Sequence, residues 1–220
     1  EFKDYFSHKE CDDSFDFMNY QHIGGRLFSY FNDSLLLSTG DMGHENLSDT
    51  ESSIFGKIIN IKDNKNNFNI ISKGHRNPQG LYYDKIRNLI LNTEHGPTGG
   101  DEVNINDLKG KTKHFGWPFA SYAIDDEIKY KDSHAKYGYV EPTLNFTPSI
   151  GISQIIKVPE DFFSEQRKKN RYFVTSLGWD YQIDEGDNTI HIIDLDDNQK
   201  IIGKDKLKVF QRMRDIIYVK

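Results

Sequence analysis

The sequence predicts an all-β protein of 220 residues. Apolar and β-branched residues recur with a period close to two, in runs of about strand length. Turn-forming pairs such as Asn32-Asp33 and Asp63-Asn64 separate these runs. Only one short and highly charged segment, Glu160–Asn170, has the pattern of a helix. A chain rich in short strands and poor in helix forms a sandwich, a barrel or a propeller.

Each predicted strand is an apolar run bounded by turn residues. In chain order the runs are Arg26–Phe31, Ser34–Thr39, Lys57–Lys62, Asn69–Ser72, Gly80–Tyr83, Leu89–Asn92, Glu102–Ile105, Gln154–Val158, Tyr172–Ser176, Thr189–Leu195, Lys206–Phe210 and Asp215–Val219. Pairs of runs recur at intervals compatible with propeller blades, which take four strands in about 40–50 residues. At that size the chain holds roughly four blades. No blade signature repeats, so the pattern by itself does not separate a propeller from a sandwich.

The end of the chain bears on its domain organisation. The final predicted strand, Asp215–Val219, has no later segment to pair with, and the chain begins at Glu1 rather than at a methionine. We therefore expect residues 1–220 to be part of one propeller domain, with its N-terminal and C-terminal parts outside this sequence.

Composition excludes several classes of protein. Hydrophobic residues make up 36% of the chain and aromatic residues 13%, enough to build a core. The net charge of -6 disfavours nucleic-acid binding, and no apolar run approaches the ~18–20 residues that span a bilayer. The single cysteine, Cys11, excludes an internal disulfide and a cysteine-rich zinc site.

Two loops rich in glycine and proline carry most of the chemistry-bearing residues. In the second loop, Gly96-Pro97 is followed by Gly99-Gly100, so the backbone there can approach a ligand closely. Free carbonyls suit a hard cation such as Ca²⁺, and Asp101 or Glu102 would add negative charge. The alternative for a Gly-Pro pair is a tight turn between strands.

Three arginines and a histidine are further candidates. Arg76-Asn77, in the first loop, places a fork of donors beside an amide, which fits recognition of an anion. Arg212 and Arg214 alternate, so on one strand both would face the same side and hold an anion between them. His22 precedes a double glycine and a strand, where it would serve as a general base. The alternatives are surface arginines paired with acids and an ordinary loop histidine.

Together these segments resemble one family, the glucose/sorbosone dehydrogenases, which include soluble quinoprotein glucose dehydrogenase and aldose sugar dehydrogenases. The matching blocks follow the family's order, and the pair GHRNPQGL and TEHGPTGGDEVN is the most specific. The blocks are residues 22–27, 36–43, 74–81, 93–104, 115–118 and 212–215.

The resemblance implies a six-bladed β-propeller that binds pyrroloquinoline quinone (PQQ) and Ca²⁺ at its central top face. It makes His22 the general base that takes a sugar hydroxyl proton while hydride passes to the quinone. The implied contacts of PQQ are Arg76, Asn77, Arg212 and Arg214. The implied ligands of the cofactor Ca²⁺ are the carbonyls of Gly96 and Pro97.

The resemblance extends to a second metal and to the substrate. Glu102, with the carbonyl of Phe115 and a contribution from Asp125, resembles a structural Ca²⁺ site. Leu47 falls where the family has a wall of the substrate pocket. Two positions depart from the family pattern. Gly178 replaces a lysine near the quinone, and Ile150-Gly151-Ile152 replaces an aromatic substrate platform.

The predicted function is therefore PQQ- and Ca²⁺-dependent oxidation of an aldose or related sugar at its anomeric carbon. The resemblance also implies a periplasmic or secreted protein with a small-molecule sugar as its substrate. One alternative is a non-catalytic extracellular binding propeller of the same superfamily. Another is a Ca²⁺-dependent propeller hydrolase such as a lactonase, which would need side-chain carboxylate and asparagine ligands around its metal.

Overall fold

The structure is a computed structural model that describes residues 5–8, 10, 21–62, 67–124, 130, 133–162, 170–178 and 188–219. In these residues it consists of strands and three short 3₁₀ turns, Phe31–Asp33, Glu45–Ser48 and Ala135–Tyr137, with no α-helix among them. The predicted all-β class is confirmed. Most of the predicted helix at Glu160–Asn170 lies outside the described residues.

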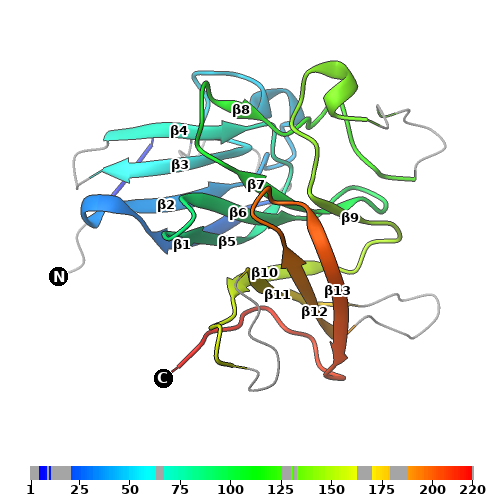
Figure 1. Cartoon of the computed structure of the whole chain (residues 1–220). Coiled ribbons are helices and arrows are strands. Elements are labelled where there is room, and N and C mark those ends of the chain that lie inside the picture. Colours follow the sequence, from blue (N-terminus) through cyan, green and yellow to red (C-terminus); the bar gives the residue numbers. More distant parts are fainter. Residues whose placement is uncertain are drawn as a thin grey trace.

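The strands form three sheets (Figure 1). The first has the order β1-β2-β3-β4-β8 and contains β1 (Gly24–Ser29), β2 (Leu35–Thr39), β3 (Lys57–Lys62), β4 (Asn67–Lys73) and β8 (Lys113–His114). The second has the order β5-β6-β7-β9, with β5 (Pro78–Asp84), β6 (Leu89–Glu94), β7 (Asp101–Asn106) and β9 (Leu144–Phe146). The third has the order β10-β11-β12-β13, with β10 (Ile152–Lys157), β11 (Arg171–Ser176), β12 (Thr189–Leu195) and β13 (Ile201–Lys208).

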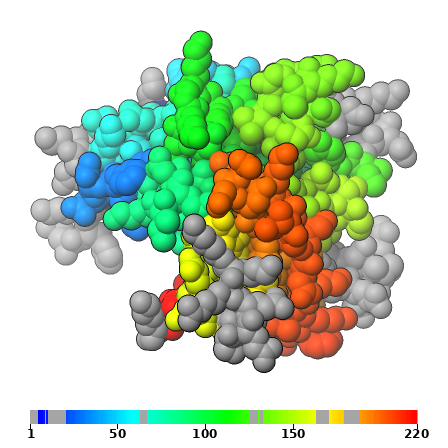
Figure 2. All heavy atoms as spheres, viewed as in Figure 1, coloured from blue at the N-terminus to red at the C-terminus, as the bar shows by residue number. Residues whose placement is uncertain are grey.

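Neighbouring strands within each sheet run antiparallel, except that β8 joins β4 in parallel. They also follow one another in the chain, apart from β4 with β8 and β7 with β9. Between sheets, the first strands meet: β1 packs against β5, and β5 packs against β10. Sheets built outward from adjoining first strands have the arrangement of propeller blades. In the view of Figure 2, β12 and β13 of the third sheet, coloured orange, lie at the molecular surface.

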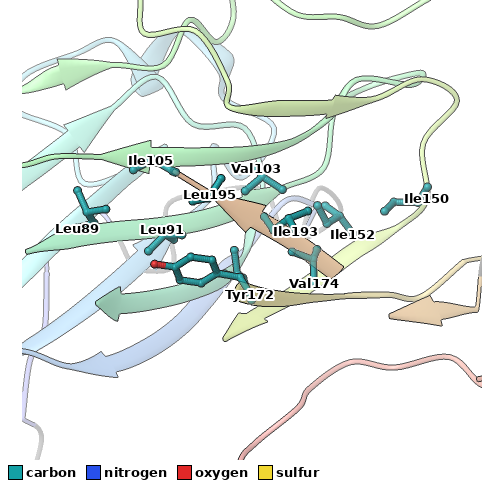
Figure 3. Close-up of a cluster of buried hydrophobic side chains, with 11 residues drawn as sticks. Leu89, Leu91, Val103, Ile105, Ile150, Ile152, Tyr172, Val174, Ile193 and Leu195 are labelled. Atoms are coloured by element: carbon teal, nitrogen blue, oxygen red, sulfur yellow. The ribbon is translucent and has the colours of Figure 1, made fainter. Parts of the chain in front are cut away.

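Two apolar clusters hold the sheets together. The larger lies between the second and third sheets and is formed by Leu89, Leu91, Val103, Ile105, Ile150, Ile152, Ile155, Tyr172, Val174, Ile193 and Leu195 (Figure 3). The smaller lies between the first and second sheets and is formed by Leu36, Ile58, Leu81, Tyr83 and Ile90. The second sheet is covered on both faces, so every residue of β6 and β7 is buried.

Most predicted strands are confirmed. Every predicted run before residue 211 overlaps an observed strand, and Lys57–Lys62 and Thr189–Leu195 match it residue for residue. The predicted strand Asp215–Val219 is wrong, because this segment forms no ladder. Its first residue instead makes an ion pair with Arg26 of β1, with Asp215 Oδ2 at 2.8 Å from Arg26 Nη1.

The predicted count of about four blades is not confirmed, since the described residues form three sheets. The same residues include no helix long and apolar enough to cross a bilayer.

Candidate active site

His22 lies in the loop just before β1, and its backbone conformation depends on close contact with Gly40. Its φ of 55° is in the left-handed region, which non-glycine residues rarely adopt. Its carbonyl lies against Gly40, where a β-carbon would overlap the carbonyl oxygen. The amide of Gly40 donates to the carbonyl of Ile23 at 3.0 Å. Gly40 therefore allows the loop that carries His22 to rest on the end of β2.

Asp41 fixes the imidazole of His22. Asp41 is fully buried, and its Oδ1 lies 2.8 Å from His22 Nδ1 and accepts from the amide of Gly43 at 2.9 Å. Its Oδ2 accepts from the indole Nε1 of Trp117 at 2.7 Å. An ionised carboxylate only accepts hydrogen bonds, so Nδ1 of His22 carries the proton. Nε2 of His22 is then left with a free lone pair, as a general base requires.

Arg76 lies on the other side of Trp117. Its guanidinium carbon is 5.4 Å from the centre of a Trp117 ring, and its Nη1 donates to the carbonyls of Gly96 at 2.9 Å and His95 at 3.4 Å. Its Nε is buried and has no hydrogen-bond partner. Burial lowers the pKa of Arg76, and the nearby charge of Asp41 opposes that shift. A buried cation with an unused donor fits an anionic ligand.

Asn77 and Arg214 are connected through Gln79. Nη1 of Arg214 donates to Oε1 of Gln79 at 3.0 Å, and Nε2 of Gln79 donates to Oδ1 of Asn77 at 2.7 Å. Arg212 is exposed and, within the described part of the chain, makes no side-chain hydrogen bond to another predicted site residue. The predicted placement of Arg212 and Arg214 on one face of a strand is wrong, because residues 211–219 are irregular.

The Gly96–Gly100 loop is held from beneath by Asp101, the buried first residue of β7. Its Oδ1 accepts from the amide of Gly96 at 3.2 Å and from Oγ of Ser149 at 2.9 Å. Its Oδ2 accepts from the amides of Ile150 and Ile152, both at 3.0 Å. Both carboxylate oxygens of Asp101 therefore accept hydrogen bonds from the loop or from the segment leading into β10. It is a brace for the Gly96 and Pro97 carbonyls rather than a free ligand.

Two buried carboxylates face each other next to this loop. Nδ2 of Asn104 bridges them, donating to Oε1 of Glu94 at 2.7 Å and to Oε2 of Glu102 at 3.2 Å. Burial and then the charge of Glu94 raise the pKa of Glu102 well above its usual range. Oε1 of Glu102 is 3.8 Å from Nε2 of His134, which is fully buried. A proton on Glu102 or a bound cation would relieve the repulsion between Glu102 and Glu94. Part of that repulsion is offset at Glu94, whose Oε1 lies 2.9 Å from Nδ1 of His75 and whose Oε2 accepts from the amide of Arg76 at 2.9 Å.

A small cavity connects the loop to these carboxylates. It has a volume of about 10 Å³, roughly the room of one water molecule. Its lining includes Arg76, Gly96, Pro97, Glu102, Phe115 and Trp117. His22 and Arg214 do not line it, but His22 reaches Arg76 through Asp41 and Trp117.

Leu47 is half-buried on the 3₁₀ turn that follows Asp41. This turn is tied to β3 by Lys57, a fully buried lysine. Its Nζ donates to the carbonyls of Leu47 and Ser48, both at 2.8 Å, and of Phe55 at 2.7 Å. The lysine therefore fixes the backbone of the predicted pocket wall.

Within the described residues, no group of three or more His, Cys, Asp or Glu side chains is arranged to hold a metal ion. Asp125, the further candidate ligand of the second Ca²⁺ site, lies outside the described residues.

Sequence reasoning assigned no role to Asp41, Trp117 or Gln79. Asp41 and Trp117 both fall inside blocks that carried the family resemblance, LLLSTGDMG and FGWP. Their place inside these two blocks was the signal from which a role could have been predicted. Their contact joins residues 76 positions apart, which neither periodicity nor local composition reveals.

The chain matches the family model described as Glucose / Sorbosone dehydrogenase over residues 12–219. It belongs to this family. An uncharacterized protein of Synechocystis is 32% identical over 89% of this chain and 50% of its own length. The aldose sugar dehydrogenase YliI of Escherichia coli is 29% identical over 67% of this chain and 43% of its own length. The chain thus spans about half the length of the curated relatives it matches.

Solved structures agree on the fold. The soluble aldose sugar dehydrogenase of Escherichia coli, in its apo form, matches with a TM-score of 0.71 and 23% identity over 89% of this chain and 57% of its own. The PQQ-bound aldose sugar dehydrogenase of Streptomyces coelicolor matches with a TM-score of 0.63 and 21% identity over 88% of this chain and 52% of its own. The chain therefore has the fold of the dehydrogenase propellers.

Proposed function

We propose that the protein is a PQQ- and Ca²⁺-dependent dehydrogenase that oxidises an aldose or related sugar at its anomeric carbon. One observation carries the proposal. Within the described residues, His22, whose Nδ1 is held by Asp41, and the half-buried Arg76, whose Nε is buried and unpaired, are linked through Asp41 and Trp117. A propeller that only bound other molecules would need no such pair.

In the proposed reaction, the chain supplies a base and the side chains that would contact the cofactor. Nε2 of His22 takes the proton of the sugar's anomeric hydroxyl, and the buried carboxylate of Asp41 stabilises the imidazolium that forms. Leu47, braced by Lys57, excludes water from one side of the sugar. When bound, PQQ would supply the hydride acceptor and Ca²⁺ would supply a Lewis acid for the cofactor.

The residues present fit a tricarboxylate cofactor. Arg76 offers its buried Nε to one carboxylate, and Arg214 and Asn77 approach from the other side of Gln79. The carbonyl of Gly96 already accepts from Arg76, but a carbonyl oxygen has a second lone pair for a hard cation. The guanidinium beside that carbonyl repels Ca²⁺. We therefore expect the metal to bind with the negatively charged cofactor rather than before it.

The test separates the base from the cofactor-binding cations. His22→Ala should reduce turnover with sugars by about 10²–10⁴-fold and leave PQQ affinity largely unchanged. Arg214→Ala should lower PQQ affinity roughly ten- to a hundredfold, the effect of one lost charge-assisted bond. Arg171→Ala is a matched control, because that arginine pairs with Asp194 in the third sheet.

The measurements are PQQ titration and initial rates of dye reduction at saturating PQQ and Ca²⁺ in the complete protein. Equal losses of PQQ affinity in the His22 and Arg214 variants would refute the assigned roles. If the wild type does not bind PQQ, the alternative of a non-catalytic extracellular binding propeller is favoured. The periplasmic or secreted location implied by the family resemblance is part of the same proposal.

A further inference from the structure

Trp117 contacts both halves of the candidate site. Its indole N–H donates to Asp41, which holds His22, and its ring lies against the guanidinium of Arg76. We propose that Trp117 is a positioning residue that sets the general base and the cofactor-binding cation in fixed relation to each other. This inference rests on the proposed function and names a role that the function alone does not require.

The indole N–H controls the orientation of the Asp41 carboxylate. Oδ1 of Asp41 serves His22 and the amide of Gly43, while Oδ2 has Trp117 as its donor. With both oxygens held, the carboxylate is restrained from turning or shifting away from Nδ1 of His22. Oδ1 then stays 2.8 Å from Nδ1, and the imidazole keeps a single tautomer with Nε2 unprotonated.

The aromatic face of Trp117 restrains the orientation of the Arg76 guanidinium. One side of that group is held by the Gly96 carbonyl at 2.9 Å, and the Trp117 ring lies 5.4 Å from its central carbon. Attraction between a cation and an aromatic face fixes the tilt of the guanidinium plane. Nε of Arg76, which is buried and unpaired, is thereby kept available for a ligand.

Trp117 itself is held by backbone contacts that do not involve a ligand. Its amide donates to the carbonyl of Gly74 at 3.1 Å, and its carbonyl accepts from Oγ of Ser48 at 3.0 Å. The residue before it, Gly116, has a φ of 107°, and a β-carbon there would overlap the ring of His134. The indole is therefore in place before any cofactor binds, which makes its role measurable in the cofactor-free protein.

Two variants separate the contacts of Trp117. Trp117→Phe removes the N–H but keeps an aromatic face, and Trp117→Leu removes both. Phe119→Leu is the matched control, since Phe119 lies on the same loop and contacts His114 and Tyr139 instead.

The first readout is the tautomer of His22, measured from its ring ¹⁵N shifts by NMR in the cofactor-free complete protein. Wild type and Phe119→Leu should show one tautomer with the proton on Nδ1, whereas both Trp117 variants should show a mixture. A single Nδ1 tautomer in Trp117→Phe would overturn the proposal. In the wild type, the indole N–H of Trp117 should exchange slowly with solvent. Exchange as fast as that of an exposed indole would also overturn it, even if no variant folds.

The second readout is kinetic and uses PQQ and Ca²⁺. Trp117→Phe should lower kcat about tenfold or more and change PQQ affinity less than about threefold. Trp117→Leu should lower PQQ affinity by a further three- to tenfold or so. Equal loss of PQQ affinity in both variants would overturn the assignment to Arg76. If the wild type does not bind PQQ, the proposed function fails, while the tautomer of His22 still decides the role of Trp117.

Discussion

Replacing Asp101 with asparagine should destabilise the protein and loosen the Gly96–Pro97 loop. Asp101 accepts four hydrogen bonds, two at each oxygen. An asparagine keeps one oxygen, which will face the two backbone amides of Ile150 and Ile152 because those donors cannot turn away. Its amide NH₂ must then face Gly96 and Ser149. The hydroxyl of Ser149 can rotate and accept from it, but the N–H of Gly96 cannot.

The cost follows from this geometry. The lost bond to a charged acceptor is worth about 1.5–3 kcal/mol, and the two remaining amide bonds weaken because their acceptor is no longer charged. We expect a total loss of about 3 kcal/mol in the free energy of unfolding. For a domain of this size that lowers Tm by roughly 6–12 °C.

Urea unfolding monitored by circular dichroism measures the loss, and hydrogen exchange of the Gly96 amide reports the loop. Ser149→Ala is the control, since it removes one neutral donor from the same carboxylate and should cost about 1 kcal/mol or less. If Asp101→Asn lowers the free energy of unfolding by less than about 1 kcal/mol, or leaves the exchange rate of the Gly96 amide unchanged, then Asp101 does not support the loop as described.

Three further predictions concern other buried groups. Gly40→Ala should cost about 3 kcal/mol in urea unfolding and also reduce turnover, because its β-carbon displaces the His22 carbonyl; unchanged turnover would contradict this. Burial lowers the pKa of Lys57 from 10.5 to about 8, so the unfolded chain binds that proton more tightly. Stability should therefore rise by roughly 2–3 kcal/mol between about pH 8 and pH 10.5, and Lys57→Met should flatten this rise in thermal melts across that window. Tyr172→Phe should cost about 1.5–3 kcal/mol, because the phenol donates to the buried Asp84 carboxylate. Burial tends to raise the pKa of Asp84, but the bonds from Tyr172 and Lys157 outweigh it and lower that pKa. The cost should therefore be largest above the unfolded pKa of an aspartate and shrink in acid, and an equal cost at pH 7 and pH 3 would count against it.

The strands were predictable because their pattern is local. Runs such as Lys57–Lys62 carry β-branched residues between clear turn signals, and these fix where a strand begins and ends. β8 and β9 were not predicted, since they have two and three residues and depend on neighbouring strands. The segment Asp215–Val219 has the composition of a strand but pairs with no strand in the part of the chain that the structure describes. Pairing, rather than propensity, decided its conformation.

The candidate site was predictable only in part. His22, Arg76 and Gly96 belong to sequence blocks specific enough to carry a family resemblance. Asp41 and Trp117 also lie in such blocks, but their role depends on a hydrogen bond between distant loops, which the sequence does not reveal. Lys57 was expected to be an ordinary residue of a strand. Its burial depends on three carbonyls that converge on its ammonium group only after folding.

The contacts of Arg26 have a consequence for the order of folding. The shortest hairpins, such as β5–β6, close loops of a few residues. The ion pair from Arg26 to Asp215 and the bond from Arg26 to the carbonyl of Arg214 span 189 and 188 positions. Closing so long a loop costs more chain entropy than closing a hairpin, so we expect these contacts to form after the sheets have assembled. Contacts that form after the transition state slow unfolding without speeding folding. We therefore expect the contacts of Arg26 to lower the rate of unfolding, and so to lengthen the lifetime of the native state, without raising the rate of folding.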